Sequence, residues 1–217
     1  MYKILQIASE LNAGGVETIL FNYFANELLD DYFQIDFASH SQNGQIKEKL
    51  ENAGYRVFYI VPKKKSLFKY ISDIWRIIHI GNYNLVHVHQ NFWSWIPLLI
   101  AKINKVPIRI VHVHGNQKSI ENILLKIENF VFRYFCLHLA TNYWACGQAA
   151  ALWLYGKKRL SNITILPNAI DSSRYLKTMS RDEITDYRNQ LGITSKFVVC
   201  HVARFTIEKN HFFCVEM

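Results

Sequence analysis

The stretch LVHVHQNFWSWIPLLIAKINKVPIRIVHVHG, which runs from Leu85 to Gly115, decides the fold of this chain. It begins with a short apolar run, Leu85–His89, continues through an apolar segment of helical length, Trp93–Ile103, and ends in a second short run, Ile108–His114. Runs that are apolar at most positions are typical of strands buried on both faces of a sheet. A strand, a helix and a strand in succession predict two parallel strands joined by a crossover helix.

The same alternation extends on both sides of this stretch. The other predicted strands are all short apolar runs: Ile4–Ser9, Ile35–Ser39, Val57–Val61, Tyr143–Cys146 and Thr164–Leu166. The other predicted helices are all amphipathic and lie near Val16–Leu29, Gln45–Ala53, Leu67–Ile80, Ile120–His138 and Ala149–Tyr155. Seven strands with six intervening helices predict an α/β fold with a Rossmann-like, doubly wound parallel sheet.

The alternation stops near Asn168–Tyr175, where Pro167 and a polar cluster mark a boundary. We therefore expect a first domain over residues 1–171. Residues 172–196 are predicted to form an interdomain linker that contains a helix, Arg181–Gln190, followed by Gly192 as its C-terminal glycine.

A β-branched run at Phe197–Ala203 predicts the first strand of a second Rossmann-like domain, of which residues 197–217 are a fragment. A strand without neighbours leaves its backbone groups unpaired and its apolar side chains uncovered. We therefore expect this tail to be poorly ordered or prone to aggregation.

The composition is that of a globular protein, because half of the 217 residues are hydrophobic and 14% are aromatic. The first apolar run is too short for a signal peptide. The longest apolar stretch, Ile96–Ile103, is interrupted by Lys102 and falls far short of the roughly 20 residues that span a bilayer. The four cysteines have neither the density of a disulfide framework nor the spacing of a metal finger, which indicates a cytoplasmic protein.

The net charge of +8 favours anionic partners, such as phosphate-bearing substrates, an acidic membrane surface or nucleic acid. Nucleic acid is disfavoured, because the positive residues are scattered and no groove-reading module is present. The segment Pro62–Tyr70 interleaves lysines with apolar residues at the start of a predicted helix. It suggests peripheral contact with anionic headgroups on the inner face of a membrane, although a solvated helix start is an alternative.

Ligands of doubly wound sheets bind outside the carboxyl ends of the strands. After the first predicted strand, the pair Gly14-Gly15 stands at a turn into a helix, where a bare backbone lets an anion approach the free N–H groups. The alternative is a tight turn without a ligand. The dinucleotide fingerprint G-x-G-x-x-G is absent, and Ser39 and His40 stand where a ribose-binding acid is expected, which disfavours a dehydrogenase.

Two predicted strands end in the pattern His-x-His, with His87 and His89 in one and His112 and His114 in the other. Alternate residues of a strand point to the same face, so each pair lies on one side of the sheet. We expect His87 and His112 to be hydrogen-bonded core residues, whereas His89 and His114 stand at the ligand edge. No carboxylate or cysteine is spaced to complete a zinc site, so no metal is expected.

The chain carries four motifs in order: Gly14-Gly15-Val16-Glu17, the two His-x-His strands, Leu166-Pro167-Asn168-Ala169-Ile170-Asp171, and Ala203-Arg204-Phe205-(x)2-Glu208-Lys209-Asn210. With this order and these separations, the chain resembles the GT-B fold, family 4 type glycosyltransferases that build bacterial capsular polysaccharide or exopolysaccharide. The resemblance covers essentially all 217 residues.

The resemblance implies a retaining enzyme that moves a sugar from a nucleotide donor, a UDP-sugar, to a glycan or lipid-linked acceptor. Its N-terminal domain would hold the acceptor, and its C-terminal domain would hold most of the donor. By position, Gly15 would lie near the donor diphosphate, and Arg204 and Lys209 would bind the nucleotide sugar. Two basic side chains can stabilise a leaving diphosphate without a metal ion.

The resemblance also implies that His114 is a catalytic residue in contact with the transferred sugar. Gly14, His89 and Asn91 would take part in binding the acceptor.

The chain departs from the family pattern at three places. Ala169 and Ala203 stand where the family usually has glycine, and both departures are minor because alanine is also small. The paired-glutamate segment of the family, which holds the sugar and ribose of the donor, would lie beyond Met217. We therefore expect a truncated chain with an incomplete donor site, and the alternatives are a catalytically inactive acceptor-binding module or the relic of an interrupted gene.

Overall fold

The computed structural model describes residues 1–12, 15–24, 32–115, 123–157, 162–169, 179–194, 197–203 and 205–216. The chain divides into two compact units, Met1–Ile170 and Asp171–Met217. Within the described ranges, every strand belongs to the first unit.

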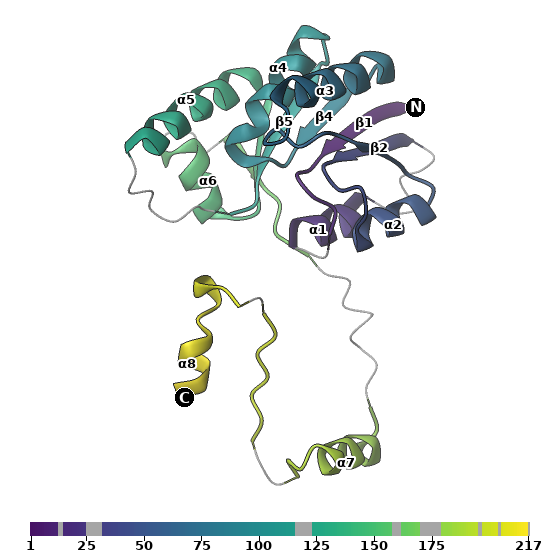
Figure 1. The fold of residues 1–217 in the computed structure, drawn as a ribbon, viewed down its shortest axis with the longest axis vertical. Helices are drawn as coiled ribbons and strands as arrows, with labels where there is room; N and C mark the ends of the chain where they lie inside the picture. The colour runs from purple at the N-terminus through teal and green to yellow at the C-terminus, as the bar shows by residue number, and fades with distance from the viewer. Residues whose placement is uncertain are drawn as a thin grey trace. The chain divides into compact units, whose positions relative to one another are not determined.

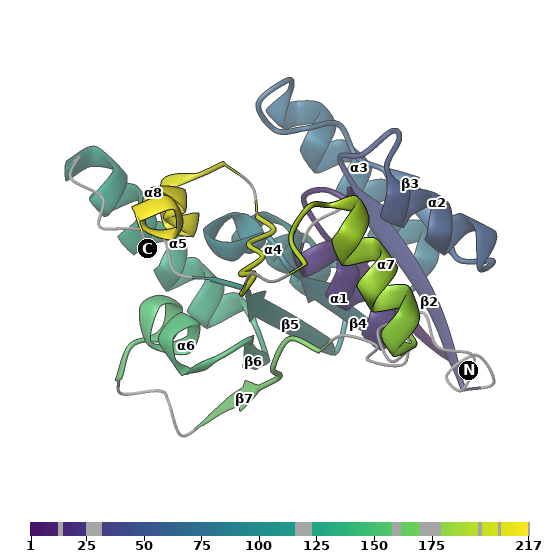
Figure 2. The ribbon, with the colours of Figure 1, turned by 90° about the horizontal axis from the view of Figure 1, so that it is seen from below.

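The first unit is built on one parallel sheet (Figure 1). Its strands are β1 (Tyr2–Ile7), β2 (Phe33–Ser39), β3 (Arg56–Tyr59), β4 (Leu85–Val88), β5 (Ile108–Val113), β6 (Asn142–Ala145) and β7 (Ile163–Ile165). Their order across the sheet is β3-β2-β1-β4-β5-β6-β7, and every neighbouring pair is parallel. Figure 2 shows β4 to β7 following one another along this sheet. The predicted α/β fold with a doubly wound parallel sheet is confirmed.

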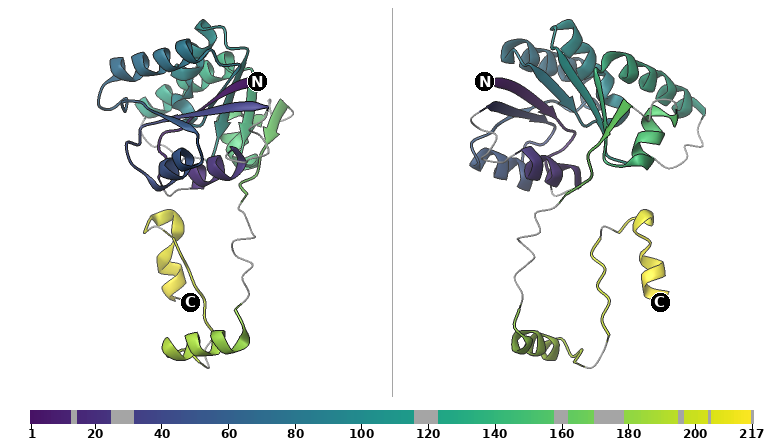
Figure 3. Two further views of the ribbon diagram at one scale, coloured as in Figure 1. Left: turned by 90° about the vertical axis from the view of Figure 1, so that its right-hand side faces the viewer. Right: turned by 180° about the vertical axis from the view of Figure 1, so that it is seen from behind.

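Helices cover both faces of the sheet (Figures 1 and 3). They are α1 (Gly15–Phe24), α2 (Gln45–Asn52), α3 (Leu67–Gly81), α4 (Trp95–Ile103), α5 (Ile123–Leu139) and α6 (Gln148–Tyr155). The helices α1 and α2 lie on one face over a small apolar cluster that includes Leu20 and Phe37. The helices α3, α4 and α5 lie on the other face over the larger core, which includes Leu5, Val88 and Val111. Of the helices in the described ranges, none combines the length and the apolar character needed to cross a bilayer.

Two strand ends differ from the prediction in a way that matters for the site. β4 ends at Val88 and β5 at Val113, so His89 and His114 follow the strands instead of closing them. The helix predicted from Trp93 begins at Trp95, because Asn91–Ser94 form a short 3-10 turn, η2, whose first residue has a φ of 50°. This turn redirects the chain immediately after the ligand edge of β4.

A buried ionic contact ties β2 to β3 and to the turn before β4. Asp36 is 1% exposed, and its carboxylate accepts hydrogen bonds from Arg56 Nε at 2.9 Å and Nη2 at 2.6 Å. The hydroxyl of Tyr83 donates to the same carboxylate at 2.7 Å. The contact raises the pKa of Arg56, and burial followed by hydrogen bonding to Asp36 raises the pKa of Tyr83. The buried charge is thus fully engaged by its neighbours.

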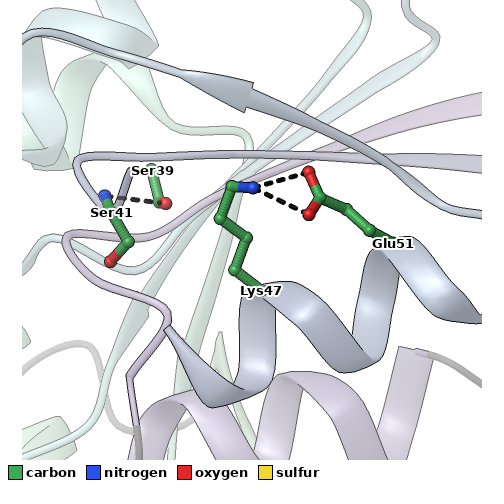
Figure 4. A network of polar contacts seen from close by, with 4 residues as sticks. All are labelled: Ser39, Ser41, Lys47 and Glu51. Carbon is green, nitrogen blue, oxygen red and sulfur yellow. Dashed lines mark hydrogen bonds and ion pairs between the residues drawn. The ribbon is translucent and has the colours of Figure 1, made fainter. Parts of the chain in front are cut away.

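A different ionic contact lies on the surface of α2, where Lys47 Nζ donates to Glu51 at 2.6 and 2.7 Å (Figure 4). The two residues are four positions apart, and their side chains are 17% and 41% exposed. Pairs of this kind contribute about 0.3–0.5 kcal/mol.

The second unit contains the predicted helix, α7 (Arg181–Gln190). Its N-terminus has a capping box formed by Ser180 and Glu183, and Gly192 follows it with a φ of 66°, as predicted. The second unit also contains the 3-10 turn η5 (Ile207–Lys209) and the short helix α8 (His211–Glu216).

The predicted strand Phe197–Ala203 is wrong. These residues have no regular secondary structure, and Phe197 and Val202 are more than 90% exposed. A strand needs a hydrogen-bonded neighbour, and in the described residues no strand lies beside this segment. The apolar surface expected for the tail is present, while its tendency to aggregate stays a prediction.

Candidate functional site at the carboxyl edge of the sheet

The carboxyl ends of the parallel strands carry two polar groups of residues. One is a cluster of histidines at the ends of β4 and β5, and the other is a pocket between the loops that follow β1, β2 and β3. Both occupy the edge at which ligands bind in doubly wound sheets.

The histidine cluster consists of His87, His89, His112 and His114. In the sheet register, His87 lies opposite Gln6 of β1, and the pairing of Val88 with Val111 sets His89 opposite His112. The ring centroids of His87 and His89 are 4.0 Å apart, as are those of His112 and His114. The side chains thus share one face, as the alternation of the sequence predicts.

A chain of hydrogen bonds runs through part of this cluster. His89 Nε2 lies 2.9 Å from Gln6 Oε1, and His89 Nδ1 lies 2.7 Å from His114 Nε2. Among the described residues, His114 Nδ1 has no hydrogen-bond partner, nor does either ring nitrogen of His112. The prediction that His112 is buried is therefore confirmed, whereas the prediction that it is hydrogen-bonded is wrong.

The four histidines are electrically neutral near pH 7. Burial lowers the pKa of His112 to about 3, with a smaller effect from His114, and burial lowers the pKa of His114 to about 4. The pKa values of His87 and His89 lie well below the ordinary value, because both rings are buried and other histidines surround them. A positive charge on any of these rings is disfavoured by loss of hydration.

The cluster also has the spacing of a possible metal site. The ligand atoms of His87, His89 and His112 lie within 4.8 Å of one another. However, both nitrogens of His89 already form hydrogen bonds, so a metal ion would have to displace Gln6 or His114. The metal-ligand group found among the described residues includes no carboxylate or thiolate to balance the charge of the ion. The absence of a metal stays a prediction.

The second group, which we call the polar pocket, has a volume of about 340 Å³. Its lining residues all come from the loops after β1, β2 and β3: Ser9, Glu10, Asn12, His40, Ser41, Asn43, Pro62, Lys63 and Lys64. Hydroxyl, amide, carboxylate and ammonium groups therefore converge at one place. Such a lining can bind both the hydroxyl groups of a sugar and an anion.

Short hydrogen bonds fix the loops that form the polar pocket. Ser41 Oγ accepts from the backbone N–H of Leu11 at 2.8 Å, and the N–H of Ser41 donates to Ser39 Oγ at 3.2 Å (Figure 4). A Cβ atom at Gly44 would come within 2.5 Å of the Leu11 carbonyl oxygen, so only glycine allows this approach. The loops after β1 and β2 are thus held together closely.

Lys63 brings positive charge to the polar pocket. Its Nζ lies 4.7 Å from the ring centroid of Trp93, which is a cation-π contact. Burial, followed by repulsion from Lys64, lowers the pKa of Lys63. In the same pocket, His40 binds the Ile60 carbonyl through Nδ1 at 3.0 Å, and its buried Nε2 has no hydrogen-bond partner among the described residues. The pocket therefore offers unsatisfied polar groups to a ligand.

The site residues predicted from the sequence lie in different parts of the structure, and some of them lie outside the described residues. Gly14 and Arg204 lie outside the described residues. Gly15 is the exposed first residue of α1, and a Cβ atom there would meet no described atom within 4 Å. Asn91 begins η2 with a buried Oδ1 that has no hydrogen-bond partner in the described ranges. Lys209 is exposed in η5 of the second unit.

The sequence analysis did not predict Gln6 or most residues of the polar pocket as functional residues. Gln6 was detectable as the one polar side chain inside the otherwise apolar run Ile4–Ile7. It is 1% exposed, so its amide needs partners. The pocket residues Ser9, Glu10 and Ser41 directly follow strands, and the rule that ligands bind at strand ends could have found them.

A model of the family described as Glycosyltransferase Family 4 matches residues 13–174 of the chain. Among curated proteins, EpsF of Bacillus subtilis (strain 168), which is named as a glycosyltransferase, is 28% identical over 223 residues. This match covers 99% of the present chain and 57% of EpsF.

Among solved structures, that of Anabaena Alr3699/HepE in complex with UDP-glucose matches with a TM-score of 0.77 and 20% identity. The complex of the same protein with UDP gives 0.75 and 18%. Both matches cover 100% of this chain and 57% of the other. A glycosyltransferase from Rickettsia africae ESF-5 gives 0.64 and 17%, over 90% of this chain and 50% of the other. These structures establish the similarity of the fold, and the chain spans between 50% and 57% of the length of these relatives.

Proposed function

The chain belongs to glycosyltransferase family 4, and from this membership we propose that it serves the transfer of a sugar from a UDP-sugar to a glycan or lipid-linked acceptor. The reaction retains the configuration of the transferred sugar and contributes to a bacterial surface polysaccharide. The ordered motifs of the sequence led to the same family.

The polar pocket carries this proposal. It lies at the carboxyl edge of β1, β2 and β3 and has a volume of about 340 Å³, which suits a sugar unit. We assign the acceptor to this pocket, with its hydroxyl groups near Glu10 and Asn12 and an anionic group near Lys63 and Lys64. A sugar attached to a phosphate, as in a lipid-linked acceptor, combines both kinds of group.

We assign the donor to the motifs of the family. The Anabaena relative was solved with UDP and with UDP-glucose, which supports a UDP-sugar for this chain. His114 would contact the transferred sugar, Gly15 would lie near the diphosphate, and Arg204 and Lys209 would stabilise its negative charge. Two cationic side chains make a metal ion unnecessary for this step.

The proposal is tested by measuring the binding of UDP-glucose by calorimetry. The 217-residue chain would be compared with an extended chain that carries the part of Anabaena Alr3699/HepE beyond the matched 57%. We expect the extended chain to bind UDP-glucose and the 217-residue chain to bind it at least about tenfold more weakly, a difference of about 1.4 kcal/mol. Absence of binding by both chains would contradict the donor assignment. Tight binding by the shorter chain would contradict the division of the donor site between two domains.

Replacement of Lys63 by Gln is expected to weaken the binding of glucose 1-phosphate to the chain about tenfold, because one charge-assisted contact in the polar pocket is lost. Lys102→Gln in the last turn of α4 removes the same charge from an exposed residue that does not line the pocket, and should leave the affinity unchanged. Titration followed by NMR gives both dissociation constants. Equal effects of the two substitutions would indicate nonspecific attraction and would refute the assigned pocket.

A cytoplasmic location with peripheral contact to an anionic membrane is part of the proposal. The segment after β3 supports it, because Phe68 is 88% exposed beside Lys64, Lys65 and Lys69. Flotation with vesicles that contain or lack anionic lipid tests this contact, and binding that ignores lipid charge would remove it.

A further inference from the structure

The hydrogen-bond chain through the histidine cluster fixes the position of protons. We propose that Gln6 and His89 are positioning residues that hold His114 in the tautomer protonated at Nε2, so that His114 presents Nδ1 as a hydrogen-bond acceptor. The group that would bind there is a hydroxyl donor, and its identification as a hydroxyl of the transferred sugar rests on the proposed function.

The first step follows from the chemistry of Gln6. Its Oε1 lies 2.9 Å from His89 Nε2, and a carbonyl oxygen can only accept a hydrogen bond. His89 Nε2 must therefore carry the proton. A neutral imidazole has one N–H group, so His89 Nδ1 is left with a lone pair.

The second step follows from the contact between the two rings. His89 Nδ1 and His114 Nε2 are 2.7 Å apart, which requires one of them to donate. Since His89 Nδ1 has no proton, His114 Nε2 donates. The proton of His114 is thus committed to His89, and Nδ1 of His114 keeps its lone pair.

Both steps require neutral rings, and burial supports this condition. It holds the pKa of His114 near 4 and that of His89 lower than usual. A protonated His89 would donate from both ring nitrogens and reverse the hydrogen bond to His114, so the direction of this chain depends on neutral rings.

The consequence concerns the kind of atom that His114 can contact. Its Nδ1 has no partner among the described residues, and burying an acceptor without a partner is unfavourable. A hydroxyl group can satisfy this nitrogen by donating to it. A phosphate oxygen cannot, because it also offers lone pairs, so the geometry points to the sugar and away from the diphosphate of the donor.

The tautomers can be read directly from NMR spectra of the ligand-free chain labelled with ¹⁵N at histidine. At pH 7.5 we expect both His89 and His114 to be protonated at Nε2, with a ¹⁵N–¹⁵N coupling across the bond from His114 Nε2 to His89 Nδ1. Single His→Gln variants assign the signals. A proton on Nδ1 of His114 would overturn the proposal.

Variants of Gln6 separate positioning from an intrinsic preference of the ring. Gln6→Met removes the acceptor at similar volume and should give a mixture of tautomers at His89 and loss of the ¹⁵N–¹⁵N coupling. Gln6→Glu keeps an acceptor and should preserve both signals. Gln34→Met on β2 is the matched control, because Gln34 belongs to the neighbouring strand and not to the chain of hydrogen bonds. Unchanged signals in a folded Gln6→Met variant would overturn the role of Gln6.

This experiment needs no sugar, so its result is independent of the proposed function. If the tautomers are as expected and UDP-glucose binds to neither form of the chain, the positioning role stands and the donor assignment fails. If UDP-glucose binds and the tautomers are reversed, the positioning role fails alone.

Discussion

Lowering the pH from 7.5 to 5 is expected to reduce the free energy of unfolding of the first unit by about 4 kcal/mol, because of His112 and His114 alone. Their pKa values in the folded chain are about 3 and about 4, whereas the ordinary value is 6.5. At pH values between the folded and the unfolded pKa, these histidines are protonated in the unfolded chain and neutral in the folded chain. Stability is therefore complete above about pH 7 and is lost as the pH falls towards 4. His87 and His89 act in the same direction.

Urea unfolding at pH 7.5, 6 and 5 measures this effect, with tryptophan fluorescence as the signal. All five tryptophans belong to the first unit, and the ring of Trp144 lies 5.0 Å from that of His87. The variant His112→Leu should lose about 2 kcal/mol of the pH dependence. It should also keep its stability at pH 7.5, because neither nitrogen of His112 has a hydrogen-bond partner among the described residues.

The control for this prediction is His79→Gln. His79 is exposed near the end of α3 and lies outside the histidine cluster. Its replacement should leave the contribution of the histidine cluster to the pH dependence in place. If His112→Leu has the same pH dependence as the unmodified chain, the cluster is not the source of the acid sensitivity.

Replacement of Arg56 by Met is expected to lower the free energy of unfolding by about 2–3 kcal/mol. The substitution keeps the apolar stem of the side chain but removes both hydrogen bonds to Asp36, which is 1% exposed. The hydroxyl of Tyr83 would still donate to the buried carboxylate, but no positive charge would then balance it at this contact. The value lies at the low end for buried pairs, because the Arg56 side chain is itself 57% exposed.

Urea unfolding at pH 7.5 tests the effect, and Lys47→Met is the matched control. The pair of Lys47 and Glu51 lies on the surface of α2, so its loss should cost less than about 0.5 kcal/mol. Adding Asp36→Asn to Arg56→Met should recover about 1 kcal/mol, because an amide is easier to bury without a counter-charge. A double variant less stable than Arg56→Met would show that the cost does not come from an unpaired buried carboxylate.

The sequence predicts the sheet well because each strand carries its own signal. Parallel strands are buried on both faces, so Val86–Val88 and Val111–Val113 lie within runs that few other structures produce. The position of His89 and His114 at the ligand edge followed from the same runs, since edge and strand end coincide in a parallel sheet.

The polar pocket could not be predicted in this way, because it depends on the order of strands in space. Its three loops, represented by Glu10, Ser41 and Lys63, meet because β3, β2 and β1 are neighbours in the sheet. No local sequence pattern predicts the order of the strands in the sheet. The hydrogen bond from His89 to Gln6 likewise joins residues 83 positions apart, and the register of β1 with β4 decides it.

The incorrect prediction of a strand at Phe197–Ala203 shows that a local preference for the extended backbone is not sufficient to form a strand. Its β-branched residues favour an extended backbone, but a strand is completed only by hydrogen bonds to a neighbour. The segment prefers an extended backbone, but no strand pairs with it in the described residues. It is therefore irregular and largely exposed.

The position of β1 inside the sheet, between β2 and β4, has a consequence for synthesis of the protein on the ribosome. One edge of β1 pairs with β4, and Lys3 bonds to Asn84, which is 81 positions later in the chain. At about 5–20 residues per second, translation takes several seconds to supply that partner. During this interval β1 and β2 can pair, while the other edge of β1 stays open. A nascent chain of this topology would therefore depend on the ribosome tunnel or a chaperone to keep that edge from other strands.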